Sequence, residues 1–139
     1  MKFIFIFISA ILALLYVSCK DEISVPIYNY TVSILQPDSL PKHLGDTLDI
    51  NVEFVSHTGE AVHHINVRIF NKATNAEVYN LPVEPHVHDV TGSHTYSDQF
   101  VLSAANGLSE GDWVLEGKVW GHEDSIEETT SRVEFHINP

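Results

Sequence analysis

The sequence predicts an all-β protein, and three observations lead to this. Apolar and polar residues alternate with a period of two, most clearly where Leu48, Ile50, Val52 and Phe54 are separated by polar residues. Gly, Pro, Asn and Asp interrupt the chain at regular intervals, as turns between short strands require. No stretch of useful length shows a helical spacing of apolar residues. We therefore expect one β domain over residues 30–139.

Seven segments fit this strand pattern, and seven strands in about 110 residues match an immunoglobulin-like β-sandwich, whose usual size is about 100 residues. Gly111-Asp112-Trp113 resembles the start of the sixth strand in such domains, with Trp113 where a tyrosine is common. Its indole N–H could replace the tyrosine hydroxyl only as a donor. The expected strands are Tyr30–Leu35, Thr47–Val55, Val62–Phe70, Glu77–Leu81, His94–Leu102, Asp112–Trp120 and Ser131–Ile137.

The N-terminal residues have the order of a signal peptide, with Lys2 followed by an uncharged apolar run from Phe3 to Val17. A membrane-spanning helix needs about 20 apolar residues, so cleavage after Ser18 is the favoured interpretation. Cys19, the only cysteine, stands where bacterial lipoproteins carry their acylated cysteine. The resemblance implies a signal peptide over residues 1–18 and a lipid-bearing tether over 19–29. An uncleaved signal anchor is the alternative.

Three charged residues follow the cysteine: Lys20, Asp21 and Glu22. They resemble the export signal by which some Gram-negative lipoproteins reach the outer face of the outer membrane. The resemblance implies a surface-exposed outer-membrane lipoprotein. A solvated linker is an equal alternative for so short a motif, and the protein would then face the periplasm.

The charge balance argues against nucleic acid as a partner. The chain carries seven Lys and Arg against 19 Asp and Glu, a formal charge of −12. Loss of residues 1–18 would remove Lys2 and none of the acidic residues. Binding of phosphates needs clustered basic residues, and here they are scattered among the acidic excess.

Nine histidines are the compositional feature that most calls for a functional interpretation. His86 and His88 flank one residue, so in a strand they would share a face about 6.5–7 Å apart and could reach one ion. His94 could close the site from across a turn, with Asp89 as an oxygen ligand or hydrogen-bond acceptor and His63 from an earlier strand. Such a site would suit Zn²⁺, Cu²⁺ or Ni²⁺. A polar loop with solvated histidines is the alternative.

A second candidate surface follows from the expected fold, in which the third, sixth and seventh strands share a sheet. If Ile65, Val67 and Ile69 point inward, the alternate residues lie on the outer face. That face could bind a protein or a glycan through exposed aromatic rings, or it could be an ordinary solvated sheet. Its candidate residues are Trp120, Phe70, His64, His122 and His136.

The sequence carries no Gly-x-Ser-x-Gly elbow, phosphate-binding Gly-rich loop or His-Glu-x-x-His motif, so we expect no enzymatic activity. A metal hydrolase would still need an open coordination position and a general base. The leader, the single Ig-like domain, the His86-Val87-His88 segment and the Gly-Asp-Trp strand together resemble a family of small, His-rich, uncharacterised bacterial lipoproteins. The resemblance implies a fold and a location without a reaction. The expected function is a membrane-anchored binding module.

Overall fold

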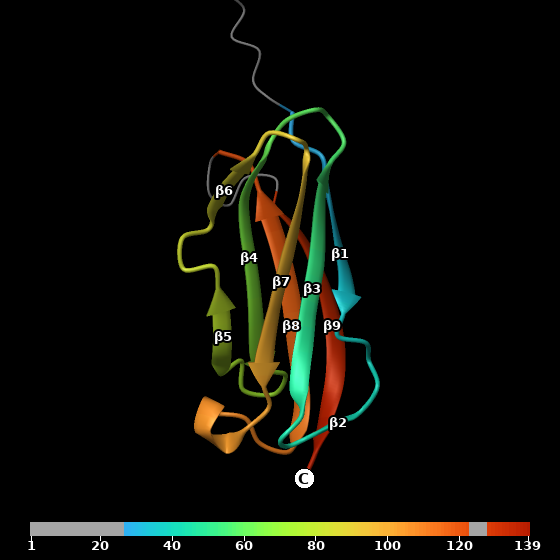
Figure 1. Cartoon of the computed structure of the whole chain (residues 1–139), viewed down its shortest axis with the longest axis vertical. Helices are drawn as coiled ribbons and strands as arrows, with labels where there is room; N and C mark the ends of the chain where they lie inside the picture. The colour runs from blue at the N-terminus through green and yellow to red at the C-terminus, as the bar shows by residue number, and fades with distance from the viewer. Residues whose placement is uncertain (1–26, 123–127) are drawn as a thin grey trace, which may run out of the picture.

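The chain folds into two largely antiparallel sheets packed face to face (Figure 1). The computed structural model of the protein describes residues 27–122 and 128–139. One sheet has the order β1-β3-β7, and the other has the order β2-β9-β8-β4-β5 with β6 also paired to β4. The elements are β1 (Tyr30–Gln36), β2 (Lys42–His43), β3 (Thr47–Ser56), β4 (Val62–Asn71), β5 (Glu77–Leu81), β6 (His86–Asp89), β7 (Ser93–Val101), the 3₁₀ turn η1 (Ala104–Asn106), β8 (Gly111–Trp120) and β9 (Thr129–Asn138).

All seven predicted strands are present, with ends that differ by at most two residues. The described residues hold two further strands that the sequence pattern did not indicate. β2 is two residues long and pairs in parallel with β9, while β6 is four residues long and follows Pro82 and Pro85. Segments this short contain no alternation to recognise, and a proline in a run argues against a strand.

The predicted inward faces of β4 and β8 are confirmed. Ile65, Val67 and Ile69 on β4 are 0% exposed, as are Leu115 and Val119 on β8. The neighbouring residues along each strand project to the other face, as the period of a strand requires. The β4-β8-β9 order is also as expected for the third, sixth and seventh predicted strands. The alternation of apolar and polar residues therefore predicts correctly which face of β4 and of β8 is buried.

The two sheets approach each other closely at Gly117 of β8. A Cβ at this position would lie 2.9 Å from Cγ1 of Val52 and 3.0 Å from Cγ1 of Val32, which belong to the opposite sheet. Contacts this short leave no room for a methyl group in a close-packed interior. Glycine at 117 lets β8 lie against β1 and β3.

Trp113 occupies the corner that the sequence assigned to it. Its ring is 2% exposed and belongs to the core, and its indole N–H donates to the carbonyl of Ser109 at 2.9 Å. The donor therefore ties the start of β8 to the loop before it, in the way expected when an indole stands in place of a phenol. The hydroxyl of Tyr79 on β5, whose ring is buried in the core, donates to Asp98 on β7 and so joins the two sheets.

The outer face of β8 carries a buried carboxylate. Glu116 is 3% exposed and accepts hydrogen bonds from Arg68 Nε at 2.7 Å and Arg132 Nε at 2.6 Å, which come from the strands on either side. Burial alone would raise the pKa of Glu116, yet the two guanidinium groups outweigh it and the pKa lies below its usual value. The three residues link β4, β8 and β9 across the sheet.

Replacing Glu116 with Gln should lower the free energy of unfolding by about 2 kcal/mol near neutral pH, because two charged hydrogen bonds are weakened. The value is modest because the two arginines are partly exposed and their charges are screened by water. Since the pKa of Glu116 is lower in the folded state, its contribution is complete above the unfolded pKa and is lost as the pH falls through the folded one.

Urea unfolding of the wild type and Glu116→Gln, from neutral pH down to about pH 3, measures this difference. The difference in the free energy of unfolding between these two proteins should become smaller in acid. Glu134→Gln, which removes an exposed partner of Lys72, is the matched control and should change stability by less than about 0.5 kcal/mol. A gap that persists unchanged in acid would contradict the assignment.

Candidate metal centre

Five histidines meet at one end of the larger sheet, where β4 begins and β8 ends. His63 and His64 belong to the start of β4, His86 and His88 belong to β6, and His122 follows β8. The antiparallel pairing of β6 with β4 brings His86 directly opposite His64, although the two are 22 residues apart in the sequence. Figure 1 shows β6 beside the beginning of β4, at the end of the sandwich from which β1 starts.

The pairing of β4 and β6 is irregular at this point. Val62 lies opposite Asp89, and His64 lies opposite His86. Between these pairs β4 contributes one residue, His63, and β6 contributes two, Val87 and His88. This is the arrangement of a β-bulge, which redirects side chains on the strand with the extra residue. Val87 packs against the core, whereas both histidines of β6 are exposed.

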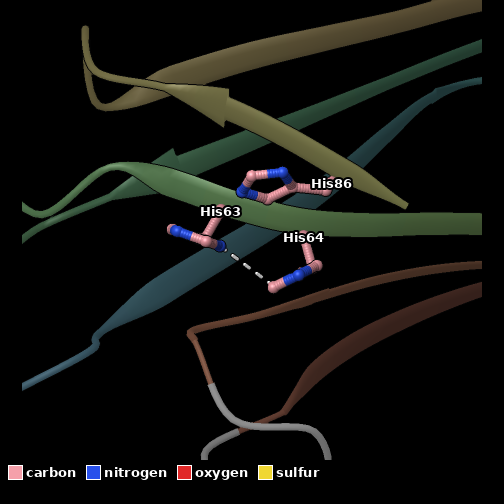
Figure 2. A group of neighbouring side chains, drawn as sticks. All are labelled: His63, His64 and His86. Atoms are coloured by element: carbon pink, nitrogen blue, oxygen red, sulfur yellow. Dashed lines mark hydrogen bonds between the residues drawn. The ribbon is translucent and has the colours of Figure 1, made fainter. Parts of the chain in front are cut away.

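His63, His64 and His86 form a group that could hold a metal ion. One ring nitrogen from each lies within 4.8 Å of the others. Nδ1 of His63 is 3.1 Å from Nδ1 of His64, and the ring centroids of His63 and His86 are 4.5 Å apart. Figure 2 shows the three rings around a common space, two from β4 and one from β6. The rings also differ in exposure, with His63 buried and His86 exposed.

Further rings surround this trio. Nδ1 of His88 lies 3.2 Å from Nε2 of His63, and the centroid of His122 lies 3.9 Å from that of His63. Nδ1 of His64 is 2.7 Å from the carbonyl oxygen of Gly121, and its ring stacks on Trp120 at an interplanar angle of 9°. Other imidazoles thus surround His63, while Trp120 and Gly121 at the end of β8 contact His64.

Enclosure keeps the centre of the group uncharged. Burial first, and then the surrounding imidazoles, which would repel its proton when protonated themselves, lower the pKa of His63 to about 4. The pKa of His86 is also lowered, first by partial desolvation and then by its histidine neighbours. Neutral imidazole is the form that binds metal ions, so His63 and His86 keep their lone pairs available in the neutral pH range.

The structure brings together some of the residues proposed as ligands from the sequence and separates others. His63 and His86 belong to the trio, and His88 contacts His63. His94 lies on β7 and forms a separate pair with Asp89, with 3.4 Å between His94 Nδ1 and an Asp89 oxygen. His64 was assigned to a different surface, because nothing in the sequence revealed that β6 would pair beside it.

The prediction of an exposed aromatic face is wrong in its main premise. Trp120 is 7% exposed and Phe70 is 6% exposed, although both lie on the predicted outer side of the sheet. The guanidinium carbon of Arg68 lies 4.7 Å from the centre of the Phe70 ring, and Lys118 Nζ lies 4.9 Å from that of Trp120. Long cationic side chains and the stacked His64 cover rings that the strand pattern alone would leave in water. Of the remaining candidates, His122 is exposed and His136 is bonded to Asp112.

The residues that carry the expected membrane attachment lie outside the described ranges. These are the signal peptide at 1–18, Cys19 and the charged residues Lys20, Asp21 and Glu22. The described part of the chain contains no helix with the length and apolar character needed to cross a membrane. Attachment through Cys19 therefore stays a prediction from the sequence.

Comparison with known proteins supports the fold. No family model matches the chain, and no curated protein matches it. A solution structure of the CARDB domain of a Pyrococcus furiosus protein aligns over 81% of this chain and 97% of its own length, with a TM-score of 0.54 and 14% identity. A crystal structure of that domain in complex with di-metal ions gives a TM-score of 0.51, 12% identity and coverage of 82% and 96%.

A Niemann-Pick type C2 protein from the Japanese carpenter ant is also similar, with a TM-score of 0.50, 10% identity and coverage of 81% of this chain and 94% of that one. At such identities the similarity concerns the fold alone. The prediction of an all-β, immunoglobulin-like sandwich is confirmed by these neighbours and by the two packed sheets.

The lowered pKa of His63 predicts that the metal-free domain loses stability in mild acid. The unfolded chain takes up a proton near pH 6.5, whereas folded His63 does so only near pH 4, so stability declines as the pH falls between these values. The loss should approach about 3 kcal/mol at the lower value. In the His63→Gln variant, urea unfolding should show a shallower decline over this window. A slope equal to that of the wild type would contradict the assignment.

Proposed function

We propose that this chain is a membrane-anchored, non-catalytic module that binds a divalent transition-metal ion through His63, His64 and His86. The observation that carries the proposal is the convergence of three imidazole nitrogens within 4.8 Å at the paired ends of β4 and β6. Two of the ligands come from one strand and the third from its neighbour, so the backbone ladder holds them together before an ion arrives. Sites supported by strands are more precise than sites on loops.

The chemistry of the donors favours particular metals. Imidazole nitrogens suit Zn²⁺, Cu²⁺ and Ni²⁺, whereas Ca²⁺ and Mg²⁺ prefer oxygen ligands. Three protein nitrogens leave a coordination position for water or for a ligand from outside the chain. We propose Zn²⁺ or Cu²⁺ as the ion. The similar CARDB domain in complex with di-metal ions supports the idea that a sandwich of this shape can carry metal.

A metal titration of the full chain in detergent tests the proposal directly. We expect one equivalent of Zn²⁺ or Cu²⁺ to stay bound after dialysis. When the free ion exceeds the dissociation constant a hundredfold, stability should rise by about 2.7 kcal/mol, which calorimetry detects as a higher melting temperature.

His64→Ala and His86→Ala should abolish both the retained metal and the thermal shift, because two ligands bind far more weakly than three. His136→Ala is the matched control, since that histidine lies on β9 and is bonded to Asp112 outside the group. Absence of retained metal in the wild type at micromolar ion would end the proposal, as would equal binding by the His86 variant.

We propose that a lipid on Cys19 holds the domain at the outer membrane, facing outward. The support is the sequence of the leader and the single cysteine at its end. Cys19→Ser should abolish incorporation of a labelled fatty acid and move the protein from the membrane fraction to the soluble fraction, because lipid chains supply the membrane affinity. Retention of the variant in membranes would instead indicate an uncleaved anchor. Protease treatment of intact cells should digest the wild-type domain.

A further inference from the structure

We propose that His88 is a positioning residue, which accepts a hydrogen bond from Nε2 of His63 and so helps to keep the lone pair of that ring on Nδ1, where the ion can take it. The inference rests on the proposed function and adds to it which nitrogens are the ligands and which residue supports that choice. It follows from the hydrogen-bonding atoms around His63 and His64, beginning at a backbone carbonyl whose role is fixed.

The first step assigns the proton of His64. The carbonyl oxygen of Gly121 can only accept a hydrogen bond, and Nδ1 of His64 lies 2.7 Å from it. Nδ1 of His64 must therefore carry the proton. In the neutral ring, the lone pair then resides on Nε2, which becomes the ligand atom of His64. A backbone carbonyl that receives the second ring N–H is a common support for metal-binding histidines.

The second step assigns the proton of His63. Nδ1 of His63 lies 3.1 Å from the N–H-bearing Nδ1 of His64, and two N–H groups would repel each other at this distance. Nδ1 of His63 therefore presents a lone pair, and the proton of its neutral ring lies on Nε2. That atom is 3.2 Å from Nδ1 of His88, which must accept the bond. The protons of three rings are thus set in sequence from the Gly121 carbonyl.

The backbone of His88 adopts an uncommon conformation. Its φ angle is +50°, in the left-handed region, which few residues other than glycine occupy and in which histidine, asparagine and aspartate are enriched. It is one of the two β6 residues that oppose His63 in the bulge, where a glycine commonly takes this conformation. Position 88 instead carries a histidine, whose ring contacts His63. Strained residues of this kind concentrate at functional sites.

This assignment changes the role of the His-x-His segment. His86 and His88 do not chelate one ion together. His86 is a ligand with His63 Nδ1 and His64 Nε2, while His88 supports His63 from the opposite side of its ring. On binding, the ion takes the lone pair of His63 in place of its 3.1 Å contact with the His64 N–H, and no ligand has to lose a proton.

Two variants separate this role from a structural one. His88→Gly removes the acceptor and relieves the strained φ, so we expect an unchanged or raised melting temperature together with Zn²⁺ affinity that is about 10–100-fold weaker. His88→Asn tolerates the left-handed conformation, and its side-chain oxygen can accept in place of Nδ1. It should restore most of the affinity. Zn²⁺ titration calorimetry on the full chain in detergent gives the affinity and the stoichiometry.

Nitrogen-15 NMR of the metal-free, histidine-labelled chain tests the proton assignment independently of metal binding. The wild type should show His63 protonated on Nε2 and His64 on Nδ1, and His88→Gly should show a larger share of His63 protonated on Nδ1. His63 protonated on Nδ1 in the wild type would overturn the inference. So would undiminished affinity of His88→Gly, or two bound ions in the wild type falling to one in that variant, since His88 would then be a ligand. If the wild type binds no Zn²⁺, the proposed function fails while the NMR result still decides the assignment.

Discussion

Backbone hydrogen bonding along β4 positions β5, β6 and β8 in the larger sheet. One edge of this strand pairs with β8 from His64 to Asn71, and the other edge pairs with β6 at its beginning and with β5 at its end. The inward residues of β4 are fully buried between the sheets. Since a shift of one residue would turn these side chains to water, the core fixes the register, and the register places His64 opposite His86.

The fold could be predicted from the sequence because most of its strands are nine or ten residues long and display their periodicity. The alternation at Leu48 to Phe54 and at Ile65 to Ile69 identified both the strands and their buried sides, and both sides are as predicted. The candidate metal centre could be predicted from the sequence only in part. His63 and His86 could be selected by composition and spacing, but the role of His64 depends on a four-residue strand that follows two prolines. Such a strand exists because β4 offers it an edge, and sequence spacing does not encode that.

The misjudged aromatic surface illustrates the same limit. Strand alternation correctly placed Trp120 and Phe70 outside the core, yet it says nothing about neighbours on the same face. Lys118 and Arg68 lie over these rings, and His64 stacks on Trp120. A residue can thus face away from the core and still be sheltered from water. The covered tryptophan instead forms part of the support behind one of the candidate ligands.

Gly121 connects this support to the start of the domain. A Cβ at position 121 would lie 2.4 Å from the ring of Tyr28, so the backbone that presents the carbonyl to His64 rests directly against this tyrosine. Tyr28 in turn stacks on Tyr30 at the beginning of β1. The residue that presents its carbonyl to His64 therefore packs against the segment that leads into β1, so the start of the domain and the orientation of His64 share one contact.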